Sequence, residues 1–113
     1  MKYILTDKTM NYGGVVLHRI QATKDFNFIK AGDFGGWVEK EANLSQEGYC
    51  WIFDNAKVYD NACVFGNTRV YGSACVFGNA RVYDNALVLD DAVVSGNARV
   101  YGSAKVFGNE TKS

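Results

Sequence analysis

Hydrophobic and polar positions alternate along the stretch from Cys50 to Asn109 in ten consecutive six-residue units without an insertion. In each unit a small residue stands two places before an aliphatic residue, and a polar pair of the Gly-Asn or Asp-Asn kind follows. Period-two alternation puts the small and the aliphatic side chain on one side of a short strand. Glycine, aspartate and asparagine tolerate a positive φ, so the polar pairs predict corners. We therefore expect a five-residue strand and a sharp corner in every unit.

Strands and corners that repeat in this way predict a coil of three units, or eighteen residues, that stacks on the next coil. The pattern resembles the left-handed parallel β-helix of the hexapeptide-repeat proteins, and the left hand comes from that resemblance. The motif of that family combines an aliphatic residue, a small or acidic residue, two variable residues and a small residue. The chain departs from it because an aromatic residue usually follows the aliphatic one. In style it also resembles small uncharacterised β-helix proteins of phages and bacteria.

The predicted fold is all-β, a left-handed parallel β-helix of about three coils with an N-terminal β-rich cap. Residues 1–49 form the cap, residues 50–109 the β-helix and residues 110–113 a polar tail. Within the cap, Tyr3–Thr6 and Val15–Ala22 are β-prone and flank a turn, which predicts a hairpin. A cap is expected because the first coil of an open β-helix exposes unpaired backbone groups.

Charge and cysteine content narrow the classes of function. Twelve basic and twelve acidic residues give a net charge of zero, which argues against general nucleic-acid binding. No apolar run is long enough to span a bilayer, so no membrane association is expected. Among three cysteines, Cys50 is predicted inward and Cys63 and Cys75 outward on different faces, so no disulfide is expected. These features favour a cytoplasmic protein.

Aromatic side chains are predicted to point outward, because alanine and valine already fill the inward positions. Contiguous exposed aromatic residues usually mark an interface, and hexapeptide-repeat relatives commonly assemble as trimers. We therefore expect a homotrimer; the alternative is that the N-terminal segment of the same chain covers some of the rings. The candidate interface residues are Trp51, Phe53, Phe65, Tyr71, Leu87, Leu89 and Phe107.

One outward face is predicted to stack Arg81 on Arg99 with Tyr83 on Tyr101 beside them. Like charges on adjacent strands are mildly destabilising, which makes this pair a candidate for function. Guanidinium groups bind phosphate or carboxylate and tyrosines stack on planar rings, so the four residues predict a site for a small anionic or nucleotide-like ligand. Alternatively, each arginine lies over a tyrosine ring or pairs with an acid across a subunit interface.

Catalytic and metal-binding residues are sparse. His18 is the one histidine, it lies outside the repeat, and we expect it to be packed rather than catalytic. A zinc hydratase needs three histidine ligands. The aspartates alternate with glycines at the corners and are predicted to be structural. We therefore expect no metal, no cofactor and no enzyme: a binding protein first, a structural or assembly module second, and an acyltransferase-like enzyme as the least favoured alternative.

Overall fold

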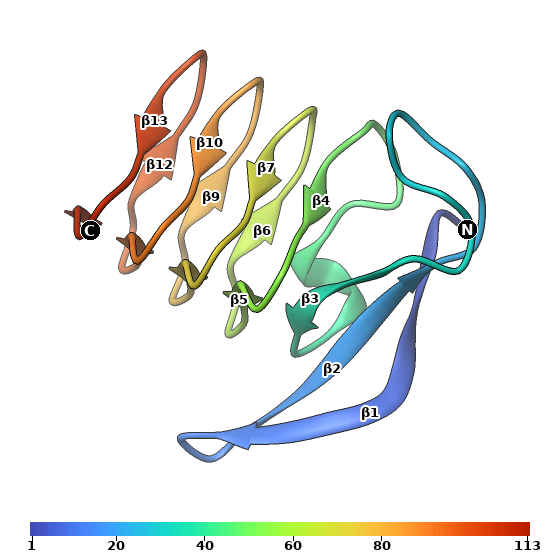
Figure 1. Cartoon of the computed structure of the whole chain (residues 1–113). Helices are drawn as coiled ribbons and strands as arrows, with labels where there is room; N and C mark the ends of the chain where they lie inside the picture. The colour runs from blue at the N-terminus through green and yellow to red at the C-terminus, as the bar shows by residue number, and fades with distance from the viewer.

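The computed structural model describes all 113 residues and contains a hairpin followed by stacked coils (Figure 1). The hairpin and the strand after it are β1 (Tyr3–Tyr12), β2 (Val15–Ala22) and β3 (Phe34–Val38), and a short 3-10 turn, η1 (Glu41–Asn43), follows. The coil strands are β4 (Trp51–Ile52), β5 (Lys57–Val58), β6 (Cys63–Val64), β7 (Arg69–Val70), β8 (Cys75–Val76), β9 (Arg81–Val82), β10 (Leu87–Val88), β11 (Val93–Val94), β12 (Arg99–Val100), β13 (Lys105–Val106) and β14 (Thr111–Lys112).

The coil strands form three parallel sheets along the sides of the stack. One sheet continues through β3, β5, β8, β11 and β14, a second through β4, β7, β10 and β13, and a third through β6, β9 and β12. Val58 pairs with Val76, which in turn pairs with Val94, so each coil spans eighteen residues. The all-β parallel β-helix is thereby confirmed, with strands of two residues rather than five because the remaining residues of each unit form the corners. The left hand stays a prediction.

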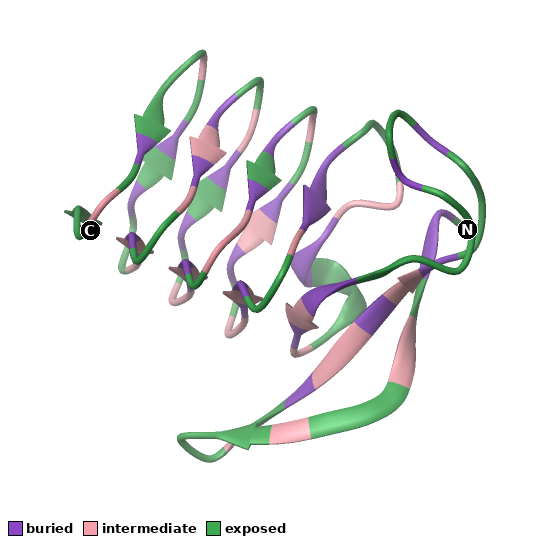
Figure 2. Cartoon of the chain, in the orientation of Figure 1, coloured by how far each residue is buried: buried purple, intermediate pink, exposed green.

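The core of the stack consists of the inward small and aliphatic positions (Figure 2). Val58, Val76 and Val94 are fully buried, as are the alanines two places before them. β-Branched valine suits a strand that packs on one face, and alanine fits the space beside the corner. The inward register predicted from the six-residue period is correct.

The corners explain why aspartate alternates with glycine. Asp84 has a φ of 62°, and its Oδ2 accepts a hydrogen bond from the N–H of Gly102, one coil further on, at 3.0 Å. The same contact joins three other pairs: Asp54 to Gly72, Asp60 to Gly78 and Asp90 to Gly108. Carboxylates stacked at successive levels would repel each other, so a glycine at the next level removes the charge and supplies a donor. These contacts account for the aspartates structurally.

The coils extend on both sides of the perfect repeat. In the N-terminal half, Val38 pairs with Val58 and Leu44 bridges to Val64 in parallel. Val38 and Leu44 are six residues apart, which is one repeat unit. Leu44 and Ile52 are eight residues apart, so two extra residues interrupt the repeat between them. At the other end, β14 pairs with β11.

The N-terminal hairpin is confirmed and continues the sheet of β3 as two antiparallel strands. A bulge between Leu5 and Thr9 bends β1, and the hairpin projects beyond the coils (Figure 1). Its tip returns to the stack: the Tyr12 ring meets the Tyr59 ring edge-on at 5.8 Å, and Lys57 Nζ lies 5.0 Å from the centre of the Tyr12 ring. The hairpin therefore covers part of one coil face. The helical element η1 has three residues, and the structure contains no candidate membrane-spanning helix.

Polar side chains near the N-terminal end of the stack satisfy carbonyl groups of the first two coils. Lys2 Nζ donates to the carbonyl oxygen of Cys50 at 2.8 Å, and Tyr3 Oη donates to the carbonyl oxygen of Glu41 at 2.9 Å. Asn43 Nδ2 donates to the carbonyl oxygen of Ala62 at 2.8 Å. Buried carbonyls without a donor are costly, so these side chains act as the cap that the open end requires.

Candidate functional site

The sheet of β6, β9 and β12 brings together the four residues predicted to bind a ligand. Arg81 and Arg99 pair in register on adjacent parallel strands, and Cys63 occupies the equivalent position on β6. Adjacent strands lie about 4.8 Å apart, so the two side chains leave the sheet one strand spacing from each other. Both arginines are exposed. The face therefore carries two neighbouring positive charges at its surface.

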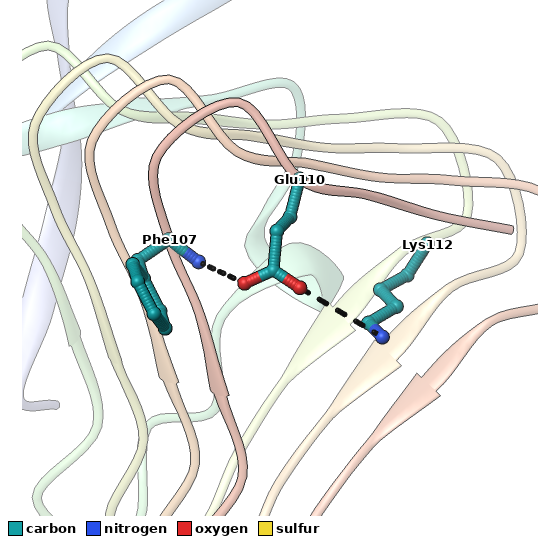
Figure 3. A network of polar contacts seen from close by, with 3 residues as sticks. All are labelled: Phe107, Glu110 and Lys112. Carbon is teal, nitrogen blue, oxygen red and sulfur yellow. Dashed lines mark hydrogen bonds and ion pairs between the residues drawn. The ribbon is translucent and has the colours of Figure 1, made fainter.

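Neither arginine has a charge partner within the chain. The one ion pair in the structure joins Lys112 Nζ to Glu110 Oε2 at 4.0 Å, and Glu110 Oε1 also accepts the N–H of Phe107 at 3.2 Å (Figure 3). The cations that lie over aromatic rings are Lys2, Lys8, Arg19 and Lys57. The predicted alternative of a cation–π contact thus does not hold for Arg81 and Arg99 within the chain. An ion pair across a subunit interface stays a prediction.

Three rings form a column beside the arginines. Phe65 and Tyr83 stack at 5.0 Å with 5° between their planes, and Tyr83 and Tyr101 stack at 5.6 Å with 14° between theirs. The coil spacing is close to the distance at which aromatic rings stack, so the repeat itself creates the column. Tyr101 is 57% exposed at the last level. Tyr101 is therefore the most exposed ring of the column.

A groove of about 460 Å³ runs along the corner next to this column. Its polar lining includes Asn67 and Asn85, joined by a hydrogen bond from Nδ2 to Oδ1 at 3.4 Å. The Asp84 carboxylate in the same groove is bonded to the Gly102 N–H. The full lining is Phe65, Gly66, Asn67, Asp84, Asn85, Gly102 and Ser103. Amide groups at this corner can donate to and accept from the edge of a heterocyclic ring.

The predicted interface residues are divided between surface and interior. Trp51 is 1% exposed, because Tyr3 and Phe26 pack edge-on against it at 6.2 and 5.3 Å, so the prediction that it faces a second subunit is wrong. The N-terminal segment of the same chain covers this ring, which is the alternative to a subunit interface given in the sequence analysis. Half-buried or exposed positions on the surface are Phe53, Phe65, Tyr71, Leu87, Leu89 and Phe107.

His18 lies on the hairpin, away from the four-residue face. Its Nδ1 is 3.1 Å from the carbonyl oxygen of Thr6, and the side chain is half-buried. On the same strand Val16 is 50% exposed and Leu17 is buried. Near its tip the hairpin contacts the coils through the Tyr12 ring, which meets the Tyr59 ring, and not through Val16.

Sequence reasoning did not find the polar cap or the contact between Tyr12 and Tyr59. Burial raises the pKa of Tyr59 to about 12, and the neighbouring Cys75 and Tyr12 act in the same direction. The pKa of Tyr12 is raised mainly by the negative form of Cys75. The contacts of the polar cap and the contact between Tyr12 and Tyr59 join segments that lie far apart in the sequence, and no periodic pattern predicts them.

Comparisons with known proteins place the repeat among β-solenoids. The family described as YdcK Beta solenoid repeat matches residues 80–96 and 94–108. A relative from Escherichia coli (strain K12), named "Uncharacterized acetyltransferase YdcK", is 47% identical over 51 residues, which are 44% of this chain and 16% of the relative. The chain thus spans a small part of that relative's length.

The name of this relative corrects one prediction. From the missing histidines we expected no enzyme, and the similarity to a protein named an acetyltransferase contradicts that expectation. The absence of histidine from the coils was therefore an insufficient reason to expect no enzyme. The repeat match and the stacked parallel coils together show that the chain is a β-helix repeat protein.

Proposed function

We propose that this chain takes part in acyl transfer and binds a coenzyme A-type acyl donor on the sheet of β6, β9 and β12. The observation that carries the proposal is the pair Arg81 and Arg99, in register and exposed, with no carboxylate at ion-pair distance. Such a donor offers phosphates, a purine ring and a thioester. The name of the Escherichia coli relative supports the acyl group as the part that is transferred.

The residues of the face match the parts of this ligand. Two guanidinium groups one strand apart suit a diphosphate, because each forms bidentate hydrogen bonds with phosphate oxygens. Tyr101 is the most exposed ring of the column, so we expect a purine to stack against it.

In the proposed reaction an acceptor amine or hydroxyl attacks the thioester carbonyl and forms a new carbon–nitrogen or carbon–oxygen bond. The carbon–sulfur bond breaks, and the proton of the acceptor ends on the sulfur of the departing thiol. The four residues bind and orient the donor and do not touch the reacting carbon. Holding two reactants in the correct geometry supplies a large part of the rate enhancement in reactions of this kind. A rigid stack of coils is suited to this task, because each side chain leaves the sheet at a fixed level.

Calorimetric titration with coenzyme A tests the proposal. Replacing Arg81 or Arg99 with alanine is expected to weaken binding about tenfold to a hundredfold, since hydrogen bonds to charged groups contribute about 1.5–3 kcal/mol. The matched control is Arg69→Ala, an exposed arginine at the same strand position of another face. Release of free thiol from acetyl-coenzyme A with a panel of amines then reports turnover. No binding by the wild-type chain, or equal binding by Arg81→Ala/Arg99→Ala, contradicts the proposal.

Self-association is a separate proposal. Phe107 is 54% exposed and Phe65, on another column of the stack, is 37% exposed, and exposed rings on the coil faces support a homotrimer packed through those faces. Sedimentation equilibrium over a wide range of concentrations gives the mass. A monomer at all concentrations contradicts the trimer without affecting the binding proposal, because Arg81 and Arg99 belong to one chain.

A further inference from the structure

Lys2 and Cys50 form a buried pair at the N-terminal end of the coil stack. Lys2 is 1% exposed and Cys50 is fully buried. Lys2 Nζ lies 3.4 Å from Cys50 Sγ, although the two residues are 48 positions apart in the sequence. The amine also donates to the carbonyl oxygens of Glu47 and Gly48, both at 3.4 Å, and lies 5.1 Å from the centre of the Phe26 ring. These contacts hold the amine against the sulfur.

Packing alone does not account for a cysteine at position 50. The equivalent inward position is alanine in eight of the ten repeat units and Thr68 in another. Alanines at these positions fill the coil completely, as Ala56 and Ala74 do with no exposed surface. The sulfur atom adds the contact to Lys2 Nζ and longer contacts to carbonyl oxygens, among them that of Ser45 at 3.6 Å. The departure from alanine therefore coincides with the one inward position that meets a lysine.

The buried environment permits a reaction between the Lys2 amine and the Cys50 thiol and makes it slow. Burial lowers the pKa of the Lys2 amine, so more of it is in the neutral, nucleophilic form than in water. Burial also raises the pKa of the Cys50 thiol, so the reactive thiolate is scarce and oxidation is slow. An oxidation product of Lys2 and Cys50 is therefore expected to form slowly, during a long exposure to an oxidant, and not within seconds.

A small oxidant has a route to the pair. A groove of about 560 Å³ is lined by Lys2, Phe26 and the segment from Gln46 to Tyr49. The thiol lies beneath this segment, where Sγ is 3.7 Å from the carbonyl oxygen of Glu47. The segment contains the two extra residues of the first coil, and Glu47, Gly48 and Tyr49 are exposed. Opening of a surface segment costs less than global unfolding, so a molecule the size of hydrogen peroxide reaches the sulfur there.

We propose that Lys2 and Cys50 form a covalent sulfur–nitrogen cross-link when a peroxide oxidises the thiol. The peroxide transfers one oxygen atom to Sγ, which gives a sulfenic acid and releases water. The Nζ lone pair then attacks the sulfur, the sulfur–oxygen bond breaks, and the hydroxyl group leaves with a proton from the nitrogen as a second water. In sum the thiol and the amine lose two hydrogen atoms, and the peroxide is reduced to two waters. The link fastens the N-terminal segment to the first coil.

Mass spectrometry tests the proposal in the full chain with Cys63 and Cys75 replaced by serine, so that Cys50 is the only thiol. After prolonged treatment with hydrogen peroxide, tryptic digestion is expected to yield one species that joins the peptides of Lys2 and Cys50 and is about 2 Da lighter than their sum, apart from a gain of about 16 Da for each oxidised methionine. Closing a loop of 48 residues is expected to raise the melting temperature by about 10 °C or more.

Two further variants control for other products. Cys50→Ala places at this position the residue found in most other units, and it is expected to stay folded and to show neither the mass loss nor the thermal shift. Lys2→Arg keeps a cation near the carbonyls without a primary amine, and it is expected to form no link. An unmodified Cys50 after treatment, a gain of about 32 Da localised to the Cys50 peptide from sulfinic acid, or a link to any other amine overturns the proposal.

Discussion

Replacing Gly66 with alanine tests how closely successive coils approach at a corner. Gly66 has a φ of 76°, and a Cβ built on it lies 3.0 Å from both the backbone nitrogen and the backbone oxygen of Asp84, one coil further on. Those atoms belong to the backbone and cannot rotate away. Gly102 occupies the same corner two coils later with a φ of 63°, and a Cβ there meets nothing within 4 Å. The two positions therefore share the backbone conformation and differ in the space above them.

The expected cost follows from two separate effects. A residue other than glycine in the left-handed region costs about 1–2 kcal/mol, and both variants pay this amount. The close contact adds a cost of about 1–3 kcal/mol to Gly66→Ala, because the coils have to move apart against their hydrogen bonds. We therefore expect Gly66→Ala to lower the free energy of unfolding by about 2–5 kcal/mol and Gly102→Ala by about 1–2 kcal/mol.

Urea unfolding followed by circular dichroism measures both values, and equal slopes in the two variants show that the comparison is valid. A difference of at least about 1 kcal/mol between Gly66→Ala and Gly102→Ala is predicted. Equal destabilisation of the two would refute the reasoning, since the coil spacing at Gly66 would then have no measurable effect.

Three further changes have expected outcomes. Since the folded-state pKa of Tyr59 is raised to about 12, the folded chain keeps the phenol proton that the unfolded chain releases above about pH 10. The contribution of this group to the free energy of unfolding is complete below about pH 10 and is lost as the pH rises toward 12. Tyr59→Phe should therefore flatten the fall of the urea midpoint over that range, and an unchanged slope contradicts this. Asp84→Ala removes the hydrogen bond to Gly102 and should cost about 0.5–1.5 kcal/mol in thermal unfolding, whereas Asp84→Asn should cost less. Tyr83→Ala removes two stacked contacts and should cost about 1–3 kcal/mol, more than Phe107→Ala, which has no ring partner.

The coils were predictable because the residues of each six-residue unit determine the inward side and the corner of that unit. Val58 and Ala56 define the inward side, and the polar pair that follows forms the corner without help from distant residues. The same regularity placed Arg81 beside Arg99 and Tyr83 beside Tyr101 correctly, since in-register stacking needs only the period. A repeat thus converts a tertiary relationship into a local one.

The first coil was not recognised as a coil because two extra residues between Leu44 and Ile52 interrupt the period. Gly36-Trp37-Val38 does show the small–variable–aliphatic order of a repeat unit, and this was the available signal. The position of Trp51 was mispredicted for a different reason. Its outward register is the expected one, but Tyr3 and Phe26 cover it from the N-terminal segment, and such contacts have no periodic trace.

A crystal structure of the chain grown with coenzyme A tests the proposed binding face most directly. The account predicts density for phosphate groups between the guanidinium groups of Arg81 and Arg99, with a purine ring stacked on Tyr101. Omission of the ligand should leave the same side chains exposed. Coenzyme A bound at a different face, or absent at concentrations that saturate the titration, would contradict the assignment of this face.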